Sequence, residues 1–111
     1  MKYLMLVYAD ESIQVSAEDA DVKPWVAEVR RRGVIGDGSR LRPPGDSTSV
    51  QVRDGELNVT DGPFAEAKEQ FAGFDVLDCR DLDEAIEVAS RHPVAQFGTL
   101  ELRPFWPFDK D

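Results

Sequence analysis

The sequence is poor in cysteine, histidine and long apolar runs, and each shortage excludes a class of protein. Because Cys79 is the only cysteine, no intrachain disulfide can form, and a reducing cytoplasm is the simplest compartment. The longest apolar run, residues 3–9, is far shorter than the ~20 residues of a membrane-spanning helix. We therefore expect neither a membrane segment nor a signal peptide. With His92 as the only histidine, we expect no metal site and no cofactor.

Basic residues are also scarce, since 13 Lys and Arg stand against 22 Asp and Glu, a net charge of -9. Such a chain repels nucleic-acid backbones and anionic membranes, so we expect direct binding to neither. A local basic cluster is nevertheless present at Arg30, Arg31, Arg32, Arg40 and Arg42. It fits a helix C-terminus, where cations offset the helix dipole, or alternatively a site for a carboxylate or phosphate.

The remaining composition fits one folded domain. Hydrophobic residues make up 41% and charged residues 32% of the chain, which is typical of a soluble globular protein. A length of 111 residues lies in the usual range for a single domain, and neither a repeat nor a linker divides the sequence. We expect a single domain over residues 1–111.

Apolar periodicity predicts the secondary structure. Strands are expected at residues 2–8, 34–41, 71–79 and 97–103, and helices at residues 24–32 and 82–91. Short helical turns are expected at residues 17–22 and 65–70. Residues 48–53 and 56–60 alternate around Asp54-Gly55, the signature of a type I′ hairpin. The expected cross-strand pairs are Arg53–Glu56, Val52–Leu57, Gln51–Asn58 and Val50–Val59.

This order of elements is typical of an α+β, ferredoxin-like fold, a split β-α-β arrangement with an antiparallel sheet and here an inserted β-hairpin. Two helices cover one face of such a sheet and leave the other bare. On the last strand, Phe97, Glu101 and Arg103 are expected on the bare face, opposite Leu100 and Leu102. We expect two copies to pack face to face as a homodimer with C2 symmetry that encloses a cavity.

The tetrapeptide Asp-Gly-Pro-Phe at residues 61–64, with Ala-Glu and Lys-Glu following, resembles the DGPF signature of the YCII-related family. Other resembling stretches are residues 1–6, Gly33 with Leu41 and Pro43, and residues 98–104. The resemblance covers nearly the whole chain and implies a dimeric α+β barrel with a cleft on the open sheet face, but no settled reaction. Some relatives act on chlorinated aromatic compounds. Many are encoded beside extracytoplasmic-function sigma factors, which implies an accessory or regulatory role with a sigma factor as partner.

Relatives of the YCII type carry a His on the first helix and an Asp before a Pro after the second helix, proposed as an acid–base pair. In this sequence the first predicted helix has no His, and the residue before Pro93 is His92. The pair therefore cannot be carried over as it stands, and the partner of His92 is open.

His92 and Asp61 are the catalytic candidates. The ordinary pKa of His92 lies near neutrality, which suits a general acid or base, and Asp75, Asp61 and Glu101 are the carboxylates that could orient it. The alternative for His92 is a cation that offsets the dipole at a helix C-terminus. The alternative for Asp61 is a purely structural turn, in which Phe64 anchors the loop in the core.

The ligand-binding candidates are Arg103, Glu101, Phe64, Arg42 and Asp75. Arg103 or Arg42 would hold an anionic group, and Phe64 would line a cleft. The alternative for Glu101 and Arg103 is a mutual ion pair.

Three functions fit the sequence. The first is a small cytoplasmic homodimer that binds an anionic or aromatic small molecule in a cleft, as an accessory or regulatory protein. The second is an enzyme of lyase or isomerase type, in which His92 or Asp61 transfers a proton. The third is an interaction protein that contacts a sigma factor through its basic cluster and its aromatic tail, residues 105–108. The tail could equally pack on its own chain or on the other subunit.

Overall fold

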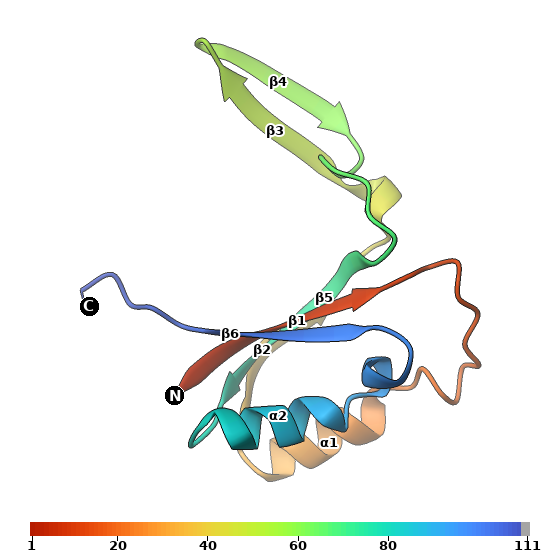
Figure 1. Ribbon diagram of the computed structural model, residues 1–111, viewed down its shortest axis with the longest axis vertical. Helices are drawn as coiled ribbons and strands as arrows, with labels where there is room; N and C mark the ends of the chain where they lie inside the picture. The colour runs from red at the N-terminus through yellow and green to blue at the C-terminus, as the bar shows by residue number, and fades with distance from the viewer. Residues whose placement is uncertain (110–111) are drawn as a thin grey trace.

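The computed structural model describes residues 1–109 and has an α+β fold with two α-helices and two antiparallel sheets (Figure 1). The elements in chain order are β1 Lys2–Ala9, α1 Lys23–Arg31, β2 Ile35–Arg40, the 3₁₀ helix η1 Pro44–Asp46, β3 Thr48–Arg53, β4 Glu56–Asp61, β5 Gln70–Asp78, α2 Leu82–Ser90, the 3₁₀ helix η2 Pro93–Gln96 and β6 Thr99–Pro104. The predicted strands and the two main helices are all present, with ends that differ by at most two residues.

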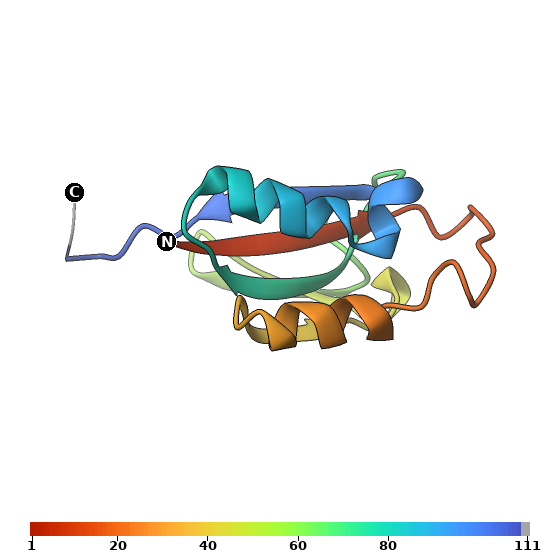
Figure 2. The ribbon, with the colours of Figure 1, turned by 90° about the horizontal axis from the view of Figure 1, so that it is seen from below.

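The main sheet has the strand order β2-β5-β1-β6, and each neighbouring pair is antiparallel. Both α-helices lie across one face of this sheet, with α1 beside β2 and α2 beside β6 (Figure 2). Strands β3 and β4 form a separate sheet that projects from the body on the opposite, helix-free side (Figure 1).

The core lies between the helices and the main sheet. Met5, Leu77 and Val88 are fully buried there, because alternate residues of the strands and one stripe of each helix carry the apolar side chains. Leu100 and Leu102 pack against this core, as predicted. Strand alternation therefore places Glu101 and Arg103 on the helix-free face.

Local sequence explains where the helices begin and end. The Asp81 side chain accepts the backbone N–H of Glu84 at 2.9 Å and so caps α2. Gly33, with φ 71°, follows α1 in a left-handed conformation that glycine adopts without strain. Arg32 joins the helices, since its guanidinium lies 2.7 Å from Glu87 of α2.

The hairpin has the predicted register, with Val50 opposite Val59 and Val52 opposite Leu57. Asp54 (φ 51°) and Gly55 (φ 78°) both have positive φ, as a type I′ turn requires. Every residue of β4 is exposed, and among residues 1–109 the hairpin pairs with no other strand.

Two expectations were wrong. Residues 65–69 form irregular chain with bends rather than a helical turn, because a single turn with no packed apolar stripe does not offset its nucleation cost. Phe97 lies outside β6 and follows η2, whose first residue, Pro93, has the φ that a helical start needs. No helix in the described part of the chain is long and apolar enough to cross a membrane.

Candidate functional site

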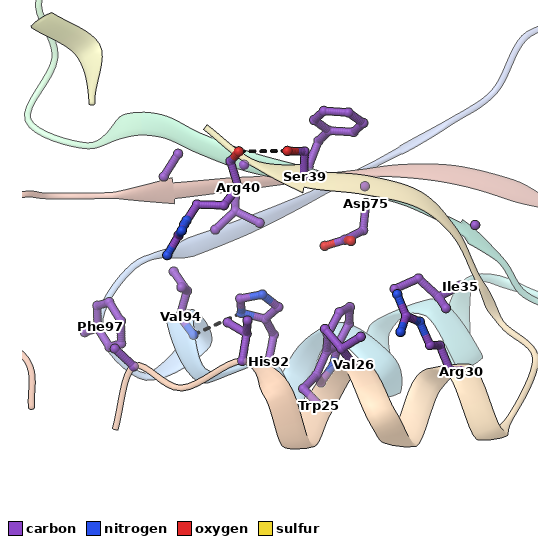
Figure 3. Close-up of a pocket in the computed structure, with 18 residues that line it drawn as sticks. Trp25, Val26, Arg30, Ile35, Ser39, Arg40, Asp75, His92, Val94 and Phe97 are labelled. Carbon is purple, nitrogen blue, oxygen red and sulfur yellow. Dashed lines mark hydrogen bonds between the residues drawn. The ribbon is translucent and has the colours of Figure 1, made fainter. Parts of the chain in front are cut away.

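A cavity of about 400 Å³ lies between α1, η2 and the β2–β5 side of the main sheet (Figure 3). Strand β2 has the sequence Ile-Gly-Asp-Gly-Ser-Arg, and Gly36, Gly38 and Ser39 all line the cavity. Side chains this small leave the space between helix and sheet unfilled. The size is in the usual range for small-molecule sites.

Most of the cavity wall is apolar. Trp25 and Val26 of α1 line it, together with Val94 of η2 and Phe97, which directly follows η2. The indole N–H of Trp25 donates to the Val88 carbonyl at 2.9 Å, which fixes the ring against α2. An apolar part of a ligand would therefore be enclosed by side chains that are already in place.

Asp75 of β5 points its carboxylate into this cavity (Figure 3). Its cross-strand neighbour on β2 is Gly38, and a Cβ atom at Gly38 would lie only 2.1 Å from Asp75 Oδ1. Glycine at this position therefore makes the room that the carboxylate occupies. Burial raises the pKa of Asp75 from 3.8 to about 6, so this carboxyl can exchange a proton close to neutral pH.

His92 is buried on the opposite wall, with 5% of its surface exposed. It is the N-cap of η2, where its Nδ1 accepts the backbone N–H of Val94 at 3.1 Å. Its ring contacts the Trp25 ring edge-on, with centroids 4.8 Å apart. Burial lowers the pKa of His92 to about 4, so the ring is neutral near pH 7 and its one proton is on Nε2.

This geometry changes the role expected for His92. A neutral ring does not offset a helix dipole, so the predicted dipole role is wrong. Because Nδ1 is engaged with the backbone, the ring can offer a ligand a hydrogen bond from Nε2–H, whereas Asp75 has the pKa suited to proton exchange.

Two arginines bring positive charge to the same cavity, Arg30 from α1 and Arg40 from β2 (Figure 3). Within residues 1–109, neither guanidinium is in an ion pair. Other members of the basic cluster are neutralised: Arg31 bonds to Glu28, and Arg32 to Glu87. The cavity thus combines apolar walls, two cations, one weakly acidic carboxyl and one neutral imidazole.

Of the predicted site residues, the structure brings together Asp75 and His92. Asp61 ends β4 on the exposed hairpin, away from this cavity. Glu101 and Arg103 form an ion pair with each other on the helix-free face. The cavity described here lies on the helix-covered face, whereas the expected cavity lay on the bare one; a single chain does not test an enclosure between two copies.

Arg42 and Phe64 lie together at a second hollow, of about 440 Å³, at the base of the hairpin. Arg42 Nε is 3.0 Å from Asp46 Oδ2. Phe64 is 85% exposed, so the expectation that it anchors the loop in the core was wrong. Pro63 lies beside it in this hollow, where the 61–64 turn leaves the hairpin.

Sequence reasoning missed that Trp25, Arg30 and Arg40 would share one cavity with Asp75 and His92. The one usable signal in the sequence is the presence of Gly36, Gly38 and Ser39 within the predicted strand 34–41. Cys79 is buried, and burial raises the pKa of its thiol, which makes it unreactive. The described residues include no group of three or more His, Cys, Asp or Glu side chains that could hold a metal ion.

Comparison with known sequences identifies relatives of this chain. The family model described as the YCII-related domain matches residues 1–109. An uncharacterized protein of Rhizobium meliloti (strain 1021) is 38% identical over an alignment of 113 positions, which covers 94% of this chain and 91% of that protein.

Proposed function

The chain belongs to the YCII-related family, and on that premise we propose that it is a cytoplasmic homodimer whose cavity binds a small, mainly apolar molecule with one anionic group. Its role in the cell would be accessory or regulatory. The observation that carries this proposal is the cavity of about 400 Å³, in which two arginines without ion-pair partners among residues 1–109 border an apolar wall.

The charges of the cavity favour an anion. A guanidinium that meets no carboxylate is ready to bind a carboxylate or phosphate group through paired hydrogen bonds. The Asp75 carboxylate repels an anion, and protonation of Asp75 removes this repulsion. Its pKa of about 6 makes the protonated form accessible. The Nε2–H of His92 supplies a further donor. An aromatic carboxylate meets all of these groups at once.

The order of the strands supports the finer description of the fold. The order β2-β5-β1-β6, with the hairpin set apart, fits a ferredoxin-like split β-α-β arrangement. On its helix-free face the sheet carries apolar cross-strand pairs, Leu4 with Val76 and Leu6 with Phe74. We propose that two copies cover these residues by packing face to face into a dimeric α+β barrel.

The binding proposal is tested by thermal unfolding with a panel of aromatic carboxylates and their neutral amides. A carboxylate at 100 times its Kd should stabilise the protein by about 2.7 kcal/mol, and the matching amide should do so much less. Arg40→Gln should weaken binding about tenfold, because a charge-assisted hydrogen bond is lost. Arg42→Gln is the matched control, since Arg42 lies outside this cavity and pairs with Asp46. Equal losses in both variants, or equal binding of acid and amide, would contradict the proposal.

A second candidate function is proton transfer, favoured by the pKa of about 6 at Asp75. In this enzyme of lyase or isomerase type, Asp75 removes or returns a proton on a bound carbonyl compound, and His92 donates a hydrogen bond to the oxygen on which charge develops. This places the proton carrier at Asp75 rather than at Asp61 or His92.

Proton transfer is tested in D₂O by NMR, with each ligand that binds and has a C–H bond next to a ketone or aldehyde carbonyl. Wild-type protein should exchange deuterium into the carbon next to the carbonyl, and Asp75→Asn should slow this exchange by about 10²–10⁴-fold while still binding. If the wild-type protein is saturated with ligand and no deuterium exchange occurs, proton transfer is excluded and ligand binding remains as the function.

A further inference from the structure

The hairpin formed by β3 and β4, residues 48–61, is called the arm. One face of the arm carries four aliphatic side chains that are more than half exposed: Val50 63%, Val52 59%, Leu57 65% and Val59 56%. The other face carries polar side chains such as Gln51 and Asn58, which pair across the strands. The arm is therefore amphipathic, but its apolar face is in water.

An isolated two-stranded hairpin is at best marginally stable in water, and it gains stability when its apolar face is covered. Strict alternation over both strands of the arm supplies such a face, and aliphatic residues that met only water would contribute little. The hydrogen bonds at the base of the arm join its two ends to each other: Gly62 N–H donates to Ser47 O at 2.7 Å, and Ser49 Oγ donates to Gly62 O at 2.8 Å.

The area that the chain exposes is larger than a compact monomer needs. Its accessible surface is 8345 Å², whereas a folded monomer of 12.4 kDa exposes about 6,100 Å². Its radius of gyration is 16.1 Å, against about 13 Å for a compact chain of this length. The arm, the loop of residues 10–22 and residues 105–109 extend from the body and contribute to this excess area (Figure 1). It exceeds the ~800 Å² that each partner buries in a stable dimer.

The arm projects on the side of the main sheet that has no helix (Figure 1). That face carries the apolar pairs Leu4–Val76 and Leu6–Phe74. A partner molecule that covers these residues therefore lies on the same side of the main sheet as the arm. One partner can thus cover both apolar surfaces.

Charge does not oppose a second copy here, despite the net charge of -9. Lys2 lies opposite Asp78 on the sheet, and the Arg53–Glu56 pair of the arm lies on its polar face with Gln51 and Asn58, away from the packing surface. Glu101 and Arg103 on the same sheet face are an ion pair. These surfaces present charges in opposite pairs, so like charges need not meet when two copies join.

We propose that the arm is a dimer clasp: in the homodimer, the apolar face of each arm packs on the body of the other copy, reciprocally. This inference rests on the homodimer proposed above and adds that the sheet face alone does not complete the interface. Each copy then supplies the cover that the arm of the other lacks.

The test measures the dimer dissociation constant by analytical ultracentrifugation for the wild type, Leu57→Lys and Asn58→Lys. Both variants add one positive charge at adjacent positions of β4, but on opposite faces of the arm. Leu57→Lys should raise the dissociation constant at least tenfold, and Asn58→Lys should leave it within about twofold. Trp25, in the core, reports through its fluorescence that the body is folded.

A dimer that is equally tight in both variants would overturn the clasp and leave the homodimer standing. A wild type that stays monomeric at every concentration would overturn both. If Leu57→Lys does not fold, the variant with Val50, Val52 and Val59 all changed to Thr replaces it. This variant keeps β-branched residues in the strands and removes only apolar contact, so it should weaken the dimer in the same direction.

Discussion

Gly38 shapes the candidate site by having no side chain. It pairs with Asp75 across the β2–β5 ladder, and a Cβ atom there would collide with the carboxylate and with the Phe74 carbonyl oxygen, 2.7 Å away. The glycine residues of β2 weaken the strand by intrinsic propensity. In the folded protein the same residues leave room for a buried acid and for the cavity beneath α1.

Gly38→Ala should destabilise the protein by about 1–3 kcal/mol, as measured by urea unfolding, because the added methyl group overpacks the site. Gly45→Ala is the control, since a Cβ atom at Gly45 meets nothing within 4 Å. In the Asp75→Ala background the cost of Gly38→Ala should fall, because one of the two colliding groups is gone. An unchanged cost in that background would show that the carboxylate is not the obstacle.

Asp75→Asn should stabilise the protein above pH 6 and have no such effect below pH 4. The native pKa of about 6 exceeds the ordinary 3.8, so the charged form is penalised in the folded state and the penalty grows as pH rises between these values. The shift from 3.8 to about 6 corresponds to about 3 kcal/mol, and solvent screening reduces this to about 1–2 kcal/mol.

Urea unfolding of both proteins at pH 4 and pH 7.5 measures this difference. Asp37→Asn is the control, because Asp37 is an exposed acid on β2. A variant that is no more stable than the wild type at pH 7.5 would contradict a desolvated Asp75.

His92→Asn tests the neutral imidazole. Asn keeps a side-chain acceptor at the N-cap of η2 but does not titrate. Because the native pKa of His92 is about 4, below the ordinary 6.5, its contribution to stability is complete above pH 6.5 and is lost as pH falls toward 4. Between pH 7 and pH 4.5 the wild type should therefore lose about 2 kcal/mol more than the variant in urea unfolding. Equal losses of unfolding free energy in the wild type and the variant would mean that His92 is exposed and has an ordinary pKa.

At the scale of elements, α2 combines a strong start signal with a buried stripe. Asp81 caps its first turn, Asp83 and Glu84 follow where the helix dipole favours acids, and Ala85 and Val88 are buried. These signals are local, which is why sequence placed this helix within one residue. The segment 65–69 has no such combination, and its predicted turn did not form.

Asp81→Ala should cost about 1 kcal/mol of unfolding free energy, because the first turn loses the acceptor for the Glu84 N–H. Thermal or urea unfolding measures the loss. Asp83 lies two residues later, in the first turn, and its side chain makes no capping hydrogen bond. Asp83→Ala should therefore lower the free energy of unfolding clearly less. A loss of the same size at both positions would mean that charge near the helix start, rather than the cap, matters.

At the scale of the whole molecule, large apolar side chains are exposed on the arm and on the tail, where Phe105 is 46% exposed and Phe108 is fully exposed. The helix-free sheet face adds the partly exposed Leu4, Phe74 and Val76. Contact of the tail with a sigma factor stays a prediction, as does its packing on a second subunit. Exposed apolar surface of this extent is typical of proteins that associate.

The thermal unfolding midpoint should therefore rise with protein concentration, because dissociation accompanies unfolding of a dimer. A hundredfold increase in concentration corresponds to about 2.7 kcal/mol of association free energy and should raise the midpoint by several degrees. Leu4→Lys on the sheet face should abolish the dependence, because Leu4 is only partly buried in the single chain, whereas Lys23→Glu at the exposed start of α1, on the other side of the sheet, should keep it. A midpoint that is the same at all concentrations would indicate a monomer.

The sequence by itself determined the strands, the two helices, the hairpin register and the core face of β6, because periodicity, caps and the Asp54-Gly55 turn act over a few neighbouring residues. It also brought out His92 and Asp75 as titratable groups of interest. Only the tertiary structure decided that these two share a cavity with Arg30 and Arg40, and that this cavity lies on the helix-covered face. The reason is that a pKa and a cavity depend on which distant segments are packed together, and the small side chains of β2 leave space only once α1 lies across them.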